Sequence, residues 1–255
     1  MIVRSLALAA MLLASAATTA QPLQVRVDGA LARPGLQSLP AGSRLADAVI
    51  AAKPTDAAYP TGAMLLRRPA QQAQLRLKAG LMHDLGVLEA GGDADVAALA
   101  RELADWLDRL PVTGRVRTEL SPRRLESTPA ANLPLVDGDR VHYPMRPTSV
   151  RIVGAVDRAC IATHVPLQDA HAYLANCPVH AAGSRDWLFV IQPDGAIQRI
   201  GTALWNRSEP QALAPGAVLY VPLAERATRA LHGDFNAELA GFLATQPMTS
   251  EEAPR

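Results

Sequence analysis

The sequence predicts an α+β fold of two tandem domains, each a small mixed sheet packed against a helix. Two observations carry this prediction. The phrase VRVDGALARPG at residues 25–35 returns as VRIVGAVDRAC at residues 150–160, with five identical positions. The phrases LVDGDRVHYP at residues 135–144 and LAPGAVLYVP at residues 213–222 both form a turn, a strand and a closing proline. A unit that begins and ends alike in both places indicates two copies of one fold.

Each copy opens with a strand. LQVRVDG alternates apolar and polar residues as a half-buried strand does, RPG makes a turn, and LQSLP returns as a second strand. Residues 41–53 then predict a helix, with Ser43 as its N-cap and Pro54 beyond its end. Residues 167–177, LQDAHAYLANC, predict the short helix of the second copy.

A hairpin follows in the second copy. DWLFVIQPDGAIQRIG contains an apolar run, a Pro-Asp-Gly turn and a returning strand. A hairpin, a helix and further strands packed over one face make a small fold of β-grasp type. The connection between the copies is short and contains Pro144 and Pro147, so we expect the two domains to keep a fixed relation.

The first copy is longer than the second, so a genuine repeat requires an insertion in it. Residues 71–110 have the character of two helices, separated by GGD with Asp93 as an N-cap. Their apolar residues recur at three- and four-residue steps: Leu75, Leu81, Leu85, Leu88, Val96, Leu99, Leu103, Trp106 and Leu107. The alternative interpretation is that these helices are the helical layer of the domain itself.

A further helix is expected near the C-terminus. Phe235, Leu239, Phe242 and Leu243 fall on one helix face, and either Asp234 or Asn236 can begin the helix. Docking on a membrane or partner is one hypothesis. Packing against the chain's own domains is favoured, because the helix is short and lacks the Lys/Arg-rich face of interfacial helices.

The N-terminus has the features of a secretory signal peptide. Arg4 is followed by an apolar run at residues 6–13 and by the small residues of ASAATTA before Gln21. The run is too short to span a bilayer, and no later segment approaches the roughly 20 apolar residues of a membrane helix. We therefore expect a periplasmic protein without an integral membrane segment after cleavage.

These features divide the chain into segments. The expected segments are a signal peptide at residues 1–20, a first β-grasp domain at residues 21–147 with its helical insert at 71–110, a second β-grasp domain at residues 148–223, a C-terminal amphipathic helix at residues 224–246 and a disordered tail at residues 247–255.

Export changes the interpretation of the two cysteines. In an oxidising compartment, Cys160 and Cys177 are expected to form a disulfide, which would contribute about 3 kcal/mol by constraining the unfolded chain. The alternative is a zinc site that adds His164, His171 and His180. Because structural zinc ligands come in pairs two to four residues apart, we expect no metal here.

Charge and motifs limit the function. The formal net charge is +1 and the basic residues form no clustered run, so binding to nucleic acid is not expected. The chain lacks the motifs G-x-S-x-G, S-x-x-K and H-E-x-x-H, and His83, His142 and His232 have no recognisable partner in the sequence. We expect no catalytic residue and no cofactor, although carboxylates paired only in space are invisible in a sequence.

Taken together, several phrases resemble the GfcC-type capsule biosynthesis family. They are VRVDGALARPG, AAYPTGAMLLRR, PVTGRV, DGDRVHYP, VRIVGAVDRA, WLFVIQPDGAIQRIG, ALWN and APGAVLYVP, in this order. The resemblance implies a periplasmic accessory protein of capsule or exopolysaccharide assembly, whose β-grasp domains resemble modules of outer-membrane polysaccharide exporters. The implied partners are polysaccharide or exporter components. A protein-only scaffold and a periplasmic glycan-modifying enzyme remain alternatives.

The resemblance also implies a ligand-binding residue. In that family the arginine of the GR pair after the insert lies in a pocket, and the matching position is Arg115. A guanidinium suits the carboxylates of acidic sugars, and Gly114 would let a ligand approach the backbone. The alternative is a structural arginine. From the resemblance, Arg115→Ala is expected to leave folding intact and impair polysaccharide assembly. The cysteine pair is not part of the family pattern.

Overall fold

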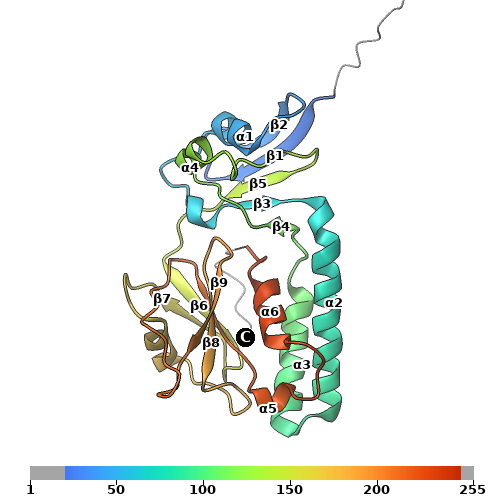
Figure 1. The fold of residues 1–255 in the computed structure, drawn as a ribbon, viewed down its shortest axis with the longest axis vertical. Coiled ribbons are helices and arrows are strands. Elements are labelled where there is room, and N and C mark those ends of the chain that lie inside the picture. Colours follow the sequence, from blue (N-terminus) through green and yellow to red (C-terminus); the bar gives the residue numbers. More distant parts are fainter. Residues whose placement is uncertain (1–20, 248–255) are drawn as a thin grey trace, which may run out of the picture.

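The computed structural model describes residues 21–247 and contains two five-stranded sheets with helices around them, so the α+β class is confirmed (Figure 1). The expected signal peptide at residues 1–20 lies outside the described residues, as does residue 248 onward of the expected tail. None of the helices in the described part of the chain is both long enough and apolar enough to cross a membrane.

The first sheet has the strand order β2-β1-β5-β3-β4. Its strands are β1 (Leu23–Gly29), β2 (Gly35–Leu39), β3 (Met64–Leu66), β4 (Arg115–Val116) and β5 (Arg140–Tyr143). Strand β1 is parallel to β5, and every other pair is antiparallel.

The second sheet repeats this arrangement, with the order β7-β6-β10-β8-β9. Its strands are β6 (Ser149–Gly154), β7 (Cys160–Thr163), β8 (Trp187–Ile191), β9 (Ile197–Gly201) and β10 (Val218–Val221). Again the first strand of the sheet is parallel to the last, here β6 to β10, and the other pairs are antiparallel. The two sheets therefore match in order and in direction.

The repeated phrase explains this match at the level of the backbone. Gly29 and Gly154 end β1 and β6 with φ of 98° and 97°. In each sheet the residue after the glycine donates its N–H to the end of the parallel strand. Ala30 donates to the carbonyl of Tyr143 at 2.7 Å, and Ala155 donates to the carbonyl of Val221 at 2.8 Å. A Cβ would lie 1.9 Å from the first carbonyl oxygen and 2.3 Å from the second. Both copies thus need glycine for the same close approach.

Helix α1 (Leu45–Ala52) covers the first sheet with the apolar face that the sequence predicts. The predicted N-cap is wrong by one residue. Arg44 is the N-cap, and its N–H donates to the Asp47 carboxylate at 2.7 Å. Ser43 instead accepts a backbone hydrogen bond from the N–H of Leu135 at 3.0 Å, which ties it to the segment between α4 and β5. A short 3₁₀ helix, η1 (Pro60–Gly62), and helix α4 (Pro122–Ser127) complete this half.

Two long helices occupy the segment expected to be helical. They are α2 (Arg68–Gly91) and α3 (Ala94–Arg109). Helix α2 begins before residue 71 because Pro69 is tolerated in a first helical turn. Asp93 caps α3 as predicted, accepting the N–H of Val96 at 3.0 Å.

The remaining helices differ from the prediction in detail. The short helix of the second copy is a 3₁₀ helix, η2 (Ala170–Asn176). The expected helix at residues 224–246 is interrupted, giving α5 (Glu225–Thr228) and α6 (Phe235–Leu243). Gly233, with φ of 93°, lies between them, and Asp234 caps α6 by accepting the N–H of Ala237 at 3.0 Å.

The apolar faces of α2, α3 and α6 share one core with the second sheet, whereas the first sheet shares another core with α1 and α4. Figure 1 shows α6 between the second sheet and the α2–α3 pair, which runs down from β3 beside the second half. The predicted face of α6 is buried, so this helix packs on its own chain. Leu75 of the predicted α2 face is 52% exposed.

The expected disulfide is present. It joins Cys160, at the start of β7, to Cys177, which follows η2, across a separation of 17 residues. Both sulfurs are therefore unavailable as zinc thiolates. His164 of the zinc alternative makes a 2.8 Å hydrogen bond through Nε2 to the carbonyl of Leu213.

Candidate functional site

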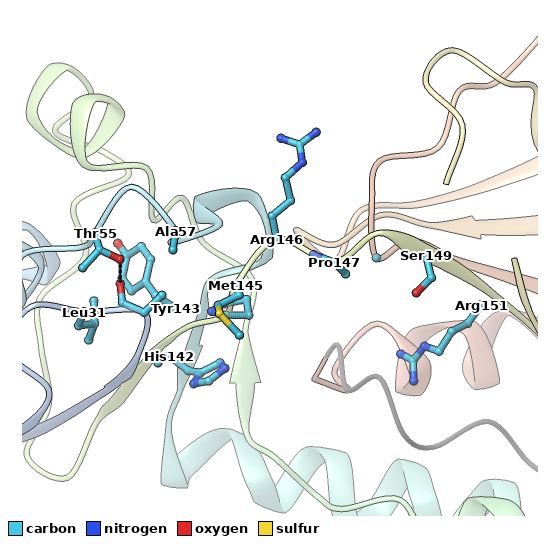
Figure 2. A pocket seen from close by; sticks show the side chains of 14 residues that line it. Leu31, Thr55, Ala57, His142, Tyr143, Met145, Arg146, Pro147, Ser149 and Arg151 are labelled. Carbon is cyan, nitrogen blue, oxygen red and sulfur yellow. Dashed lines mark hydrogen bonds between the residues drawn. The ribbon is translucent and has the colours of Figure 1, made fainter. Parts of the chain in front are cut away.

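A cleft of about 660 Å³ lies where the two sheets meet (Figure 2). Both halves line it. The first contributes the turn after β1, the loop after α1 and the end of β5, and the second contributes the start of β6 and the turn before β10. The connection between the halves, with Pro144 and Pro147, forms part of the wall. The short linker thus positions the cleft as well as joining the halves.

A histidine on this wall is oriented by a carboxylate. Strands β1 and β5 are parallel, and their register places Asp28 beside His142. The Asp28 carboxylate is hydrogen-bonded to Nδ1 of His142 and accepts a second bond from Nε of Arg140 at 2.5 Å. His142 lines the cleft, so its imidazole is held there in a fixed orientation.

The surroundings keep Asp28 ionised. Burial alone would raise the pKa of this carboxyl, but the hydrogen bonds from Arg140 and His142 outweigh burial and hold the pKa below its ordinary value. An ionised carboxylate can only accept hydrogen bonds, so Nδ1 of His142 must donate the proton between them. In the neutral imidazole, Nε2 is then an acceptor for a group in the cleft.

Two arginines add positive charge. Arg146 extends from the connection and Arg151 from β6 (Figure 2). The guanidinium of Arg146 lies 5.4 Å from the ring centroid of Tyr59, which supports an otherwise exposed side chain. Apolar surface also lines the cleft, including Met145, which is 72% exposed. The cleft therefore combines cations, a fixed imidazole and apolar patches, which suits an anionic ligand with apolar faces.

Arg115 lies elsewhere, in the contact between the halves. One Nη donates to the carbonyl of Ala244 at 3.0 Å and the other to the carbonyl of Pro193 at 2.5 Å. Burial lowers the pKa of Arg115 to about 10, an effect that the Asp194 carboxylate opposes. A polar hollow of about 680 Å³ lies close by, lined by Asp194, Arg117 and other residues but not by Arg115.

Gly114 is also engaged by its own chain. Its φ is 74°, and a Cβ there would lie 2.5 Å from the carbonyl oxygen of Arg67 and 2.8 Å from the Gln71 side chain. The buried Gln74 accepts the N–H of Gly114 at 2.8 Å and donates to the Arg115 carbonyl at 3.1 Å. The close approach that glycine permits is thus made by Arg67 and the first turn of α2. A ligand-binding role for Gly114 and Arg115 stays a prediction.

Because of these contacts, Arg115→Ala is expected to change the stability of the protein. The substitution is expected to lower the free energy of unfolding by about 2 kcal/mol, because two carbonyls lose a charged donor that joins the halves. Urea unfolding measures this loss. Arg117→Ala, an exposed neighbour, serves as the control and should stay within about 0.5 kcal/mol of wild type. A stable Arg115→Ala protein with lost polysaccharide binding would support the ligand role instead.

His142 was not predicted as a site residue from the sequence, because its partner Asp28 lies 114 residues away in the chain. A usable signal was present. Both strands were predicted. If the first strand of a copy pairs in parallel with its last strand, in the register set by the closing turn, Asp28 lies opposite His142.

Comparison with known proteins gives two family matches. A model described as "Capsule biosynthesis GfcC, N-terminal" matches residues 34–144, and one described as "Capsule biosynthesis GfcC C-terminal" matches residues 159–247. The chain is also 29% identical over 164 residues to "Uncharacterized protein YjbG" of Escherichia coli strain K12. That match covers 64% of this chain and 66% of the relative, just under two thirds of its length.

Proposed function

The chain belongs to the GfcC capsule biosynthesis family, and on this basis we propose that it is a non-catalytic accessory protein that binds polysaccharide during capsule or exopolysaccharide assembly. The cleft between the sheets is the proposed binding site. The exposed Arg146 and the oriented His142 in its lining are the observation that carries the proposal.

An acidic polysaccharide has the chemistry that this cleft suits. Carboxylates on the sugars would pair with the guanidinium group of the exposed Arg146. Sugar hydroxyls would bond to Nε2 of His142, and the apolar C–H faces of the rings would pack on Met145 and the two prolines. Because the cleft is open and lined from both halves, a polymer could pass through it without its ends being captured.

We propose further that both sheets are β-grasp modules arranged in tandem. Their shared strand order and directions support this, as do the equivalent glycines at the ends of β1 and β6. The α2–α3 pair would then be an insertion in the first module that covers the second.

A binding role fits the side chains of the cleft better than catalysis does. His142 with Asp28 resembles the base of a hydrolase, but such a base needs a nucleophile or positioned water within reach. Three residues that line the cleft carry hydroxyls, Thr55, Ser149 and Tyr143, and the buried hydroxyl of Tyr143 donates to the carbonyl of Leu120. Thr55 Oγ1 donates to the Ala30 carbonyl at 3.1 Å, away from the imidazole. An enzyme acting on glycans is therefore the second candidate, carried by the His142–Asp28 pair alone.

The proposed compartment is the periplasm, where a disulfide such as that of Cys160 and Cys177 persists. The partners proposed there are the polysaccharide itself or components of its outer-membrane exporter. A scaffold that contacts only proteins would leave the cleft empty of sugar, which the following experiment tests.

Arg146→Glu is expected to weaken polysaccharide binding by about tenfold or more, because it places a negative charge beside an anionic ligand. The variant should also fail to restore surface polysaccharide in cells that lack the gene. Arg123→Glu on α4, an equally exposed arginine outside the cleft, is the matched control and should restore it. Full restoration by Arg146→Glu would contradict the proposed site.

A further inference from the structure

An exposed tryptophan is held on a fixed turn after β9. Trp205 is 73% exposed. Within the turn, the Asn206 side chain accepts the N–H of Ala203 at 3.0 Å and donates to the carbonyl of Asp186 at 2.9 Å. A Cβ at Gly201 would lie 1.9 Å from the Asn206 carbonyl oxygen, so the turn also packs tightly on the end of β9. The indole is thus presented to solvent by a backbone that need not be ordered on binding.

Two further side chains support this indole. The ring of Trp187, on β8, meets Trp205 edge to face, with centroids 6.1 Å apart and an interplanar angle of 88°. The guanidinium of Arg199, on β9, lies 4.0 Å from the centroid of Trp187 and pairs with Glu225 at 3.5 Å. We refer to Trp187, Arg199 and Trp205 as the tryptophan platform.

A polar hollow of about 520 Å³ adjoins the platform at Trp187. Two carboxylates and two guanidinium groups line it, from Asp186, Glu225, Arg185 and Arg226. Aromatic surface beside charged donors and acceptors matches a pyranose ring, which has an apolar C–H face and a rim of hydroxyls. A protein hot spot would instead favour an apolar centre ringed by polar residues, and Leu204 is the platform's one exposed aliphatic neighbour in the turn.

The platform is separate from the cleft. In the second sheet, Ser149 and Gly216 of the cleft lie at one end, and Trp187 lies at the other end of β8. The cleft and the platform are separated by four residues along β8 and by three strand spacings, from β6 to β9. They therefore lie on the order of 20 Å apart. Variants in one site therefore need not disturb the other.

We propose that the tryptophan platform is a second carbohydrate subsite, which stacks a pyranose ring on Trp205 while the adjoining hollow binds its hydroxyls. The identity of the polymer rests on the proposed function, but the geometry of the platform does not. A long polysaccharide that contacted both the cleft and the platform would gain affinity through the higher effective concentration of its second segment.

The test uses the mature chain and short oligosaccharides released by mild acid from the surface polysaccharide of the source organism. Binding should protect Trp205 from acrylamide quenching, because the other tryptophans are less exposed, with Trp106 at 4%. Trp205→Ala should lower the affinity about tenfold, the loss of about 1.4 kcal/mol. Trp205→Phe should recover part of it, and Leu204→Ala, which removes apolar surface without a ring, should bind as wild type does.

Two results would overturn the subsite. The first combines three measurements. Trp205→Ala binds the oligosaccharides with unchanged affinity, Trp205 of the wild type is not protected from acrylamide in the complex, and Arg146→Glu still loses binding. In that case the proposed function stands and only the platform is wrong. The other is loss of a bound exporter protein, and not of sugar, from Trp205→Ala, which would make the platform a protein-docking surface. Absence of any oligosaccharide binding by the wild type would contradict the proposed function itself.

Discussion

Gly154→Ala is expected to lower the free energy of unfolding by about 4 kcal/mol. The new Cβ would lie 2.3 Å from the carbonyl oxygen of Val221 and 2.5 Å from the ring of Tyr220. Both neighbours are buried in the centre of the second sheet, so neither can move without separating β6 from β10. The φ of 97° adds backbone strain for any residue with a side chain.

Urea unfolding measures the effect, and the chain offers two matched substitutions. Gly29→Ala is the same change at the equivalent place of the first sheet, where the Cβ would lie 1.9 Å from the Tyr143 carbonyl oxygen, and it should be as damaging. Gly241→Ala in α6 meets nothing within 4 Å and should raise stability by about 0.5–1 kcal/mol. Equal stabilities of all three variants would contradict the close approach at Gly29 and Gly154. Clearly different stabilities of Gly29→Ala and Gly154→Ala would contradict the equivalence of the two positions.

Asp139→Ala is expected to lower the free energy of unfolding by about 3 kcal/mol, because it removes a buried carboxylate that accepts three hydrogen bonds and leaves Arg67, whose side chain is 18% exposed, without its ion-pair partner. Asp139 is 1% exposed and accepts two hydrogen bonds from Arg67, at 2.9 and 2.7 Å, and one from the N–H of Val136 at 2.9 Å. The bond to Asp139 raises the pKa of Arg67. This pair joins the residue before α2 to the turn before β5, so it anchors the start of α2 to the first sheet.

The control for this substitution is Asp137→Ala, two residues away in the same turn. Asp137 is exposed and accepts one hydrogen bond, from the N–H of Gln24 at 2.8 Å, so its loss should cost about 1 kcal/mol or less. Both variants can be compared by urea unfolding at neutral pH. If Asp139→Ala is no more destabilised than Asp137→Ala, the Arg67–Asp139 pair does not anchor the start of α2.

Many of the strands and helices of this fold could be predicted because they depend on local patterns, whereas β3, β4 and α4, which are short, were not predicted. Alternation and turn residues located the hairpins, and the repeated phrase indicated that both copies begin and end alike. Helical periodicity shows which face of a helix is apolar, but it does not show which part of the protein that face packs against. The pattern at residues 71–110 therefore predicted two helices, but not that Leu81, Leu85 and Leu107 would pack against the second sheet.

The candidate site was less predictable because it depends on contacts between distant residues. Arg115 and Gly114 were chosen from a resemblance, and the structure places their polar groups against Pro193, Ala244 and Gln74 of the same chain. Asp28 and His142 meet only through the parallel pairing of β1 with β5. The cleft itself forms only when both halves are assembled, so no single segment of the sequence encodes it.

Thermal unfolding of the mature chain in the presence of the organism's own surface polysaccharide tests the proposed function most directly. If the cleft binds the polymer, the midpoint of unfolding should rise with polysaccharide concentration by mass action, and the polymer should gain no new reducing ends. An unchanged midpoint at high polysaccharide concentration, or new reducing ends, would contradict a non-catalytic role in polysaccharide binding.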